Sequence, residues 1–181
     1  NLQQISVVCA HESVVGSYVD SIKSTGLTLS AIDIHDLVSK NLPCVHQGIG
    51  RTQAILSLDD RSGLLSIFHD TDLYVSRDFK IGINQIKQVS SEDESEYDSL
   101  LLEIQRSMDY FESYFGIGSV SSMSIFPRLA ATEKMARYLQ NFISFEIDFV
   151  SPGESGETGD EGILEAHCFH AYCASLRGVR Q

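Results

Sequence analysis

The stretch Glu103-Ile-Gln-Arg-Ser-Met-Asp-Tyr-Phe-Glu112 lies inside a long amphipathic segment. Around it, apolar side chains recur at steps of three and four residues, which places them on one face of an α-helix. They are Leu100, Leu101, Ile104, Met108, Phe111 and Phe115. Ser91 and Glu94 have the spacing of a capping box, and Gly116 can end a helix in the left-handed conformation. The pattern predicts one core-facing helix of about six or seven turns.

The composition indicates an acidic globular protein. The 181 residues are 43% hydrophobic and carry a net charge of −12, which is enough chain for one buried core or two small lobes. The charge repels phosphate backbones, so we expect no nucleic acid partner. No apolar run reaches the roughly 18 residues that a membrane span needs, and the first residues do not resemble a signal segment. With four scattered cysteines, we expect a reducing, cytoplasmic location.

Residues 1–43 are expected to form a small βαβα subdomain. Residues 4–10 are a short β-branched run, and residues 14–22 have helical periodicity up to a glycine at position 26. Residues 27–34 have the pattern of a second strand, and residues 35–40 that of a short helix. A strand–helix–strand–helix order indicates a sheet covered by helices.

Residues 44–181 are expected to form a larger α/β unit. Three strand-like runs come first and are joined by tight turns rich in Asp, Ser and Gly, so they predict an antiparallel meander. Two more strands flank a helix over residues 130–142, and a glycine- and glutamate-rich surface loop at 151–162 precedes a last helix that ends near Leu176. The predicted strands are residues 53–58, 64–69, 73–80, 120–126 and 144–150. The helix over 130–142 is expected to face the core through Ala131, Met135, Tyr138 or Leu139, and Phe142.

Three segments resemble the PilM-like, actin-fold assembly proteins of type IV pili. Residues 103–112 resemble the helix that this family writes with an "EI-x-RS" start, residues 73–82 resemble its strand "l-x-f-x-R-x-i-x-x-G", and residues 174–178 resemble its closing helix end. The resemblance implies an α/β fold of the ribonuclease-H-like, actin-like ATPase type, present in part. The small inserted subdomain would be residues 1–43 and the second lobe residues 44–181. The family's earlier lobe has no counterpart here, so we expect a piece of a longer protein.

The resemblance also implies where a nucleotide would bind. Actin-type nucleotide binders lay backbone N–H groups of an Asp-x-Gly hairpin against phosphate, and the carboxylate reaches a metal through water. Here that hairpin corresponds to Asp59, Asp60 and Gly63. Arg61 stands where glycine would let the backbone approach phosphate, so we interpret the three residues as a degenerate phosphate-loop remnant. The alternative is that both aspartates are ordinary turn residues.

The family's second nucleotide element is a Gly-Gly turn beside adenine. At that place the sequence is Phe126-Pro-Arg-Leu129. Proline fixes φ, and its bulky neighbours disfavour the left-handed conformations that glycine permits. Arg128 is a phosphate contact in one interpretation and an exposed arginine at a helix entrance in the other. We therefore expect no cofactor here, and ATP with Mg²⁺ only in a full-length family context.

One cluster has the character of a metal site. His167, His170 and Cys173 are three residues apart and would lie on one side of a helix. The alternative is a packing face of Leu164, Cys168, Ala171 and Ser175, in which the cysteine behaves as a small apolar residue. Because no second paired motif supports a metal, we expect none. No nucleophile and base pair is recognisable either, so no catalytic residue is predicted.

The resemblance implies a non-catalytic cytoplasmic scaffold, peripheral to the inner membrane. Its partners would be PilN-like and PilO-like inner-membrane proteins of the pilus assembly machinery. Arg106 and Asp109 would then belong to a family-specific helix or simply to a solvated face. An active actin-like ATPase or sugar-kinase-like phosphotransferase is the alternative, and it would need two phosphate loops and a glycine turn. The cytoplasmic domain of the general secretion L-type protein is a similar relative.

Overall fold

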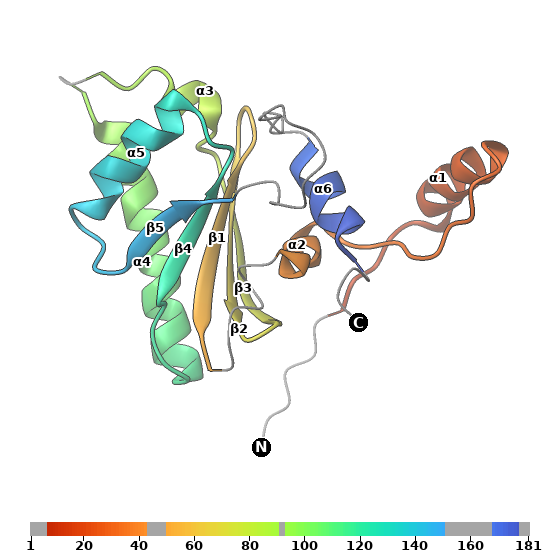
Figure 1. The fold of residues 1–181 in the computed structure, drawn as a ribbon, viewed down its shortest axis with the longest axis horizontal. Coiled ribbons are helices and arrows are strands. Elements are labelled where there is room, and N and C mark those ends of the chain that lie inside the picture. Colours follow the sequence, from red (N-terminus) through yellow and green to blue (C-terminus); the bar gives the residue numbers. More distant parts are fainter. Residues whose placement is uncertain (1–6, 43–49, 91–92, 151–167, 178–181) are drawn as a thin grey trace, which may run out of the picture. The chain divides into compact units, whose positions relative to one another are not determined.

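The computed structural model describes residues 7–42, 50–90, 93–150 and 168–177 (Figure 1). Contacts within the chain separate two compact units, Asn1–Asp33 and Ile34–Gln181. The predicted loop at 151–162 and His167 lie outside the described residues, as does most of the strand predicted at 4–10.

The described residues of the first unit contain one helix, α1 (Glu12–Ser24), where a helix was predicted. His11 caps its start by accepting the Ser13 N–H at Nδ1, and Gly26 follows its end with φ of +79°. Residues 7–10 and 27–34 form no strand, so the predicted βαβα order is wrong there. A strand needs a partner for its N–H and C=O groups, and the described part of this unit contains none.

The second unit is built on one five-stranded sheet. Its strands are β1 (Thr52–Leu58), β2 (Gly63–His69), β3 (Asp72–Phe79), β4 (Ser122–Phe126) and β5 (Glu146–Phe149). They lie in the order β3-β2-β1-β4-β5. β1, β2 and β3 pair antiparallel, which confirms the predicted meander. β4 is parallel to β1 and β5 is parallel to β4, so the two later strands join the meander through its first strand.

Helices cover both faces of this sheet (Figure 1). On one side lie α3 (Ile83–Ile86), α4 (Ser95–Phe115) and α5 (Ala130–Gln140). On the other lie α2 (His35–Val38), the 3₁₀ turn η1 (Ser39–Asn41) and α6 (Phe169–Ser175). None of the described helices combines the length and apolar character that crossing a membrane requires.

The central strand β1 supplies both hydrophobic cores. Every residue of β1 is buried. Ala54, Leu56 and Leu58 belong to the large core beneath α4 and α5. Ile55 belongs to a smaller core with residues of α2 and α6. Because alternate side chains of a strand point to opposite faces, a strand buried on both sides reads as a continuous apolar run.

The long helix α4 ends where the sequence predicts and begins later. Gly116 closes it with φ of +62°, and Ile104 and Phe111 of the predicted stripe are fully buried. The helix start expected from Ser91 and Glu94 is wrong, because the helix begins at Ser95. The side chain of Glu94, the residue before the helix, makes no capping hydrogen bond. The Asp93 carboxylate instead accepts the Ser95 N–H at 3.1 Å. Hydrogen bonds from Ser95 lower the pKa of Asp93.

The helix α5 packs through a different set of residues from the one predicted. Met135 and Leu139 are buried as expected, together with Thr132 and Ala136. Phe142 was predicted to face the core but is 54% exposed, because the helix ends at Gln140. The helical period therefore no longer applies at position 142.

The boundary between the two units lies upstream of the predicted one at 43 and 44. Val38 and Leu42 pack with Phe169 and Cys173 in the smaller core. The Asn41 side chain also donates a hydrogen bond to the Cys173 carbonyl at 3.1 Å. These contacts attach α2 and η1 to the second unit, although the sequence grouped them with the first. The assignment of the two parts as inserted subdomain and second lobe stays a prediction.

Candidate functional site

The carboxyl ends of three parallel strands mark the candidate site. β1, β4 and β5 run in the same direction, so the segments that follow Leu58, Phe126 and Phe149 leave the same edge of the sheet. In open α/β sheets, ligands bind outside this edge. The predicted phosphate loop and the predicted adenine turn are the first two of these segments, so the fold brings them to one edge.

The turn after β1 is held by the start of α3. Within the turn, the Asp59 N–H donates to the Ser62 carbonyl at 2.8 Å. The Asp59 and Asp60 carbonyls accept the N–H groups of Ile83 and Asn84 at 2.9 and 3.0 Å. The first N–H groups of a helix are the ones that could otherwise bind an anion. Here two of them are already bonded to the turn, while both aspartate side chains are exposed.

Two glycines at this turn are explained by close packing within the protein. A Cβ on Gly82 would lie 2.5 Å from both the Asp59 carbonyl oxygen and the Ser62 nitrogen. A Cβ on Gly63 would lie 2.2 Å from Cε2 of Phe79. Gly63 is buried, so its missing side chain makes room for the Phe79 ring. This packing accounts for Gly63 without a nucleotide, and the predicted nucleotide role of Asp59, Asp60 and Gly63 stays a prediction.

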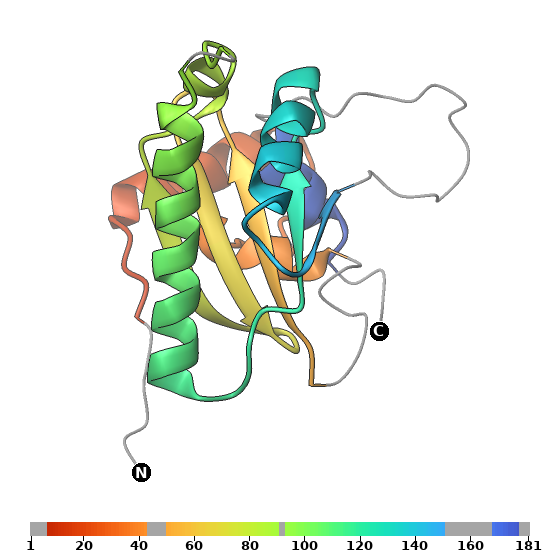
Figure 2. The ribbon, with the colours of Figure 1, turned by 90° about the vertical axis from the view of Figure 1, so that its left-hand side faces the viewer.

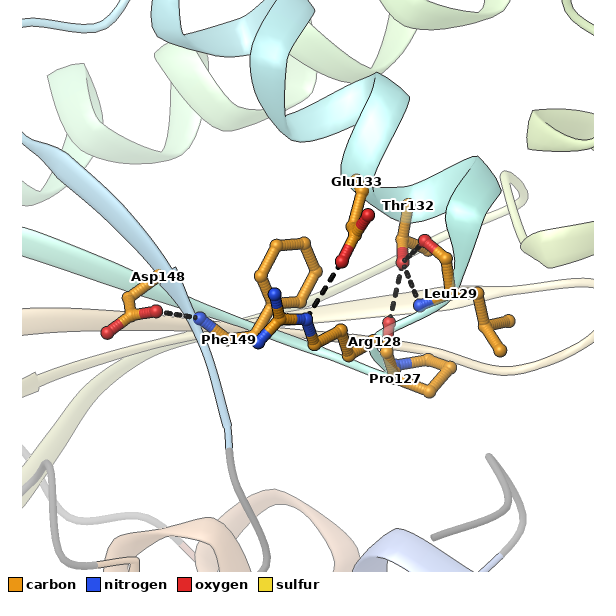
Figure 3. A network of polar contacts seen from close by, with 7 residues as sticks. All are labelled: Pro127, Arg128, Leu129, Thr132, Glu133, Asp148 and Phe149. Atoms are coloured by element: carbon orange, nitrogen blue, oxygen red, sulfur yellow. Dashed lines mark hydrogen bonds and ion pairs between the residues drawn. The ribbon is translucent and has the colours of Figure 1, made fainter. Parts of the chain in front are cut away.

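The turn after β4 is closed by a buried hydroxyl (Figure 3). Thr132 is 0% exposed. Its hydroxyl donates to the Pro127 carbonyl at 2.7 Å and accepts the Leu129 N–H at 2.8 Å. The turn backbone is therefore satisfied by its own helix, where the glycine turn of a nucleotide binder would leave room beside adenine.

Arg128 lies over this edge of the sheet and is engaged by its neighbours (Figure 3). Its Nε is 2.8 Å from Oε1 of Glu133, and its guanidinium carbon is 5.5 Å from the centre of the Phe149 ring. The Arg128 side chain is 65% exposed, as one of the two interpretations of this residue predicts. An ion pair this exposed contributes about 0–1 kcal/mol, so it positions the side chain more than it stabilises the fold.

Two histidines meet beside the same edge. The rings of His35, in α2, and His170, in α6, have centroids 3.6 Å apart and an interplanar angle of 33°. Nε2 of His170 is buried and has no hydrogen-bond partner among the described residues. Burial lowers the pKa of His170 below its ordinary 6.5, His35 lowers it further, and the charges of Asp59 and Asp36 oppose the shift. Neutral His170 is therefore the favoured form in the folded protein.

The metal cluster considered from the sequence is not brought together in the described part of α6. Cys173 is fully buried in the smaller core, while His170 contacts His35. Within residues 7–42, 50–90, 93–150 and 168–177, no group of three or more His, Cys, Asp and Glu is arranged to hold a metal ion. Cys173 packs as a small apolar residue. The packing face considered as the alternative is wrong in its residues, because Ala171 and Ser175 are exposed.

Sequence reasoning missed three residues of this edge. They are Gly82, Thr132 and His35. A glycine directly before a helix is a signal for close backbone approach. A threonine three residues into a helix is a signal for bonding to the preceding turn. The contact of His35 with His170 has no local signal, because the two residues come from the beginning and the end of the second unit.

No family model and no curated protein matches this sequence. Solved structures do. A protein in the structure titled "PilM-PilN type IV pilus biogenesis complex" matches with a TM-score of 0.68 and 14% identity over 95% of this chain. The match covers 60% of that protein's chain. The apo ParM protein of pSK41 matches with a TM-score of 0.49 and 11% identity, over 79% of this chain and 48% of that one.

The fold is the predicted one, an α/β ribonuclease-H-like, actin-like ATPase fold in part. At these identities the similarity shows the fold alone. The chain spans 60% of the PilM–PilN structure's matching chain.

Proposed function

We propose that this chain belongs to a non-catalytic scaffold of type IV pilus biogenesis, with the protein MshI of the mannose-sensitive haemagglutinin (MSHA) pilus as the nearest family counterpart. It works in the cytoplasm, peripheral to the inner membrane. Its partner is the cytoplasmic segment of a PilN-like inner-membrane protein, and a PilO-like protein belongs to the same assembly. The similarity in fold to a protein solved as a PilM–PilN complex supports this choice.

The observation that carries the proposal is the closed carboxyl edge of β1, β4 and β5. Hydrogen bonds to Ile83 and Asn84 fix the turn after β1, and Thr132 fixes the turn after β4. A nucleotide site needs backbone N–H groups that are free to donate hydrogen bonds to phosphate, and backbone that leaves room beside adenine. Here the Asp59 and Asp60 carbonyls accept hydrogen bonds from α3, and the Leu129 N–H donates to Thr132 within its own helix, which favours a recognition scaffold over an ATPase.

The test is capture of a defined partner by the full-length protein. A purified PilN-like cytoplasmic segment from the same pilus system is immobilised, and the wild-type protein and the Asp59→Ala variant are passed over it without nucleotide. We expect both to bind with the same affinity, because the Asp59 side chain is exposed and contributes no partner surface in this proposal. Gly82→Ala, which disturbs the turn itself, tests whether the folded edge is needed.

The competing function is the active actin-like ATPase or phosphotransferase. It would require Asp59 to reach a metal through water and would make partner capture depend on Mg-ATP. Binding of the PilN-like segment only in the presence of Mg-ATP, with loss on Asp59→Ala, would replace the scaffold by that enzyme. Absence of any binding to PilN-like and PilO-like segments would remove the pilus assignment altogether.

A further inference from the structure

The outer side of α4 carries a row of exposed residues four apart. α4 lies across the sheet with one side turned away from it (Figure 2). The row is Leu102, Arg106, Tyr110 and Tyr114. Leu102, Tyr110 and Tyr114 are 46%, 48% and 65% exposed, and the Arg106 side chain is 57% exposed. Exposed large apolar and aromatic side chains that gather in one row mark an interaction site more often than scattered ones do.

The row is held rigidly before any partner binds. The rings of Tyr110 and Tyr114 stack with centroids 5.3 Å apart and an interplanar angle of 15°. Nη1 of Arg106 lies 3.0 Å from Oε1 of Glu103, and Nε of Arg77 lies 3.5 Å from Oε2 of the same carboxylate. Two guanidinium groups thus share one carboxylate.

The row on one copy of α4 is complementary to the same row on a second copy, when the two helices lie antiparallel. Residues 102 and 114 are equally far from position 108, and so are residues 106 and 110. An antiparallel copy therefore places Leu102 opposite the other copy's Tyr114, and Arg106 opposite the other copy's Tyr110. The first pair is an apolar contact, and the second sets a guanidinium against an aromatic face. Rows of residues four apart interdigitate in the commonest class of helix packing.

We propose that α4 is a dimer interface, in which two copies of this chain pack through the row Leu102, Arg106, Tyr110 and Tyr114 about a two-fold axis near position 108. In such an interface each contact occurs twice, because residue i meets residue j and j meets i. Arg106 and Tyr110 of both copies form two equivalent cation–π contacts around the axis. The interface lies on the helix layer and not at the carboxyl edge of the sheet, so it is independent of the proposed pilus function.

The experiment is sedimentation velocity of the purified chain over a concentration series. We expect a monomer–dimer equilibrium with a Kd of about 1–100 μM. Arg106→Glu places a carboxylate against the opposing tyrosine face, and Tyr110→Ala removes that face. Each change acts twice in the symmetric dimer, so we expect each to weaken the dimer about tenfold or more, which is about 1.4 kcal/mol.

Arg137→Glu is the matched control, because it makes the same change of charge at an exposed position of α5. It should leave the dimer unchanged. Circular dichroism and urea unfolding establish that each variant is folded. Dimerisation that survives both Arg106→Glu and Tyr110→Ala in folded protein would overturn the proposal, as would a monomer at every concentration up to about 1 mM.

Disulfide trapping tests the antiparallel direction separately. Leu102→Cys and Tyr114→Cys proteins are prepared with Cys9, Cys44 and Cys168 changed to serine, and are then mixed and oxidised. A disulfide should form between the two variants and hardly at all within a single variant, because only position 102 faces position 114. Equal or preferential cross-linking of one variant with itself would contradict the antiparallel arrangement.

Discussion

The N–H of Ile83 donates a hydrogen bond to the carbonyl oxygen of Asp59 over a distance of 2.9 Å. This bond joins the start of α3 to the turn that an actin-type nucleotide binder would use for phosphate. It draws the two segments so close that the residue before Ile83, Gly82, has no room for a side chain. The same contact therefore shapes the turn and satisfies one of the first N–H groups of α3.

Gly82→Ala should destabilise the unit formed by residues 34–181. The new Cβ would lie 2.5 Å from backbone atoms of Asp59 and Ser62, which are less able to move than the end of a side chain. We expect a loss of about 1–3 kcal/mol in the free energy of unfolding, the usual range for overpacking. Urea unfolding followed by circular dichroism measures it.

Gly16→Ala is the control for that change. Gly16 lies within α1, and a Cβ there would meet nothing within 4 Å. Alanine favours a helix over glycine by about 1 kcal/mol, so this variant should be neutral or slightly more stable. Equal stability of the Gly82→Ala variant and the wild type would show that the turn is loose.

Thr132→Val should destabilise the fold although it keeps the shape of the side chain. It removes a buried hydroxyl that bonds both the Pro127 carbonyl and the Leu129 N–H. Leaving buried backbone groups unpaired costs about 1–3 kcal/mol. Arg128→Ala, in the same turn but exposed, should cost at most about 1 kcal/mol. If Arg128→Ala proves the more harmful change in urea unfolding, the ion pair and not the hydroxyl holds the turn.

Ile104→Asp should prevent folding of the same unit. Ile104 is 0% exposed at the centre of the core beneath α4, and an unpaired buried charge costs several kcal/mol. Gln105→Asp is the matched control, because its neighbouring position is exposed and should change stability by only about 0.5 kcal/mol. Far-ultraviolet circular dichroism distinguishes the two variants directly, and a folded Ile104→Asp protein would refute the placement of α4 in the core.

His170 should make the protein less stable in mild acid. Burial and His35 hold the pKa of His170 below 6.5, against the opposing charges of Asp59 and Asp36. The unfolded chain then takes up the proton more readily than the folded one. Stability is therefore complete above pH about 6.5 and declines as the pH falls through the folded-state pKa.

Urea unfolding at several pH values between about 8 and 5 measures this dependence. His170→Gln should reduce it. An identical pH dependence in the wild type and in His170→Gln would mean that other groups cause it.

The sequence predicted the elements of the second unit well because each carries its own periodicity. The apolar stripe of α4 and the turns between β1, β2 and β3 are local signals, and Gly116 marks a helix end that depends on φ alone. The same reasoning failed at residues 27–34. Their alternating apolar pattern fits a strand, but a strand forms only where a partner strand is available. No local sequence pattern shows whether a partner strand is available.

The residues of the candidate site could be named from the resemblance, but their surroundings could not. The resemblance assigned Asp59 to a phosphate hairpin and the Arg128 segment to an adenine turn, and the structure places both after neighbouring parallel strands. What fills this edge depends on contacts between distant segments. Phe79 occupies the space beside Gly63, and His35 meets His170. Neither contact can be predicted from the sequence near the residues involved.

Isothermal titration calorimetry with Mg-ATP tests the central claim, that the closed edge does not bind nucleotide. It should be performed on this chain with and without Asp59→Ala. We expect no binding tighter than about 1 mM, equivalent to about −4 kcal/mol, and no difference between wild type and variant. A micromolar Kd that is lost on Asp59→Ala would contradict the scaffold proposal and would establish a working nucleotide site.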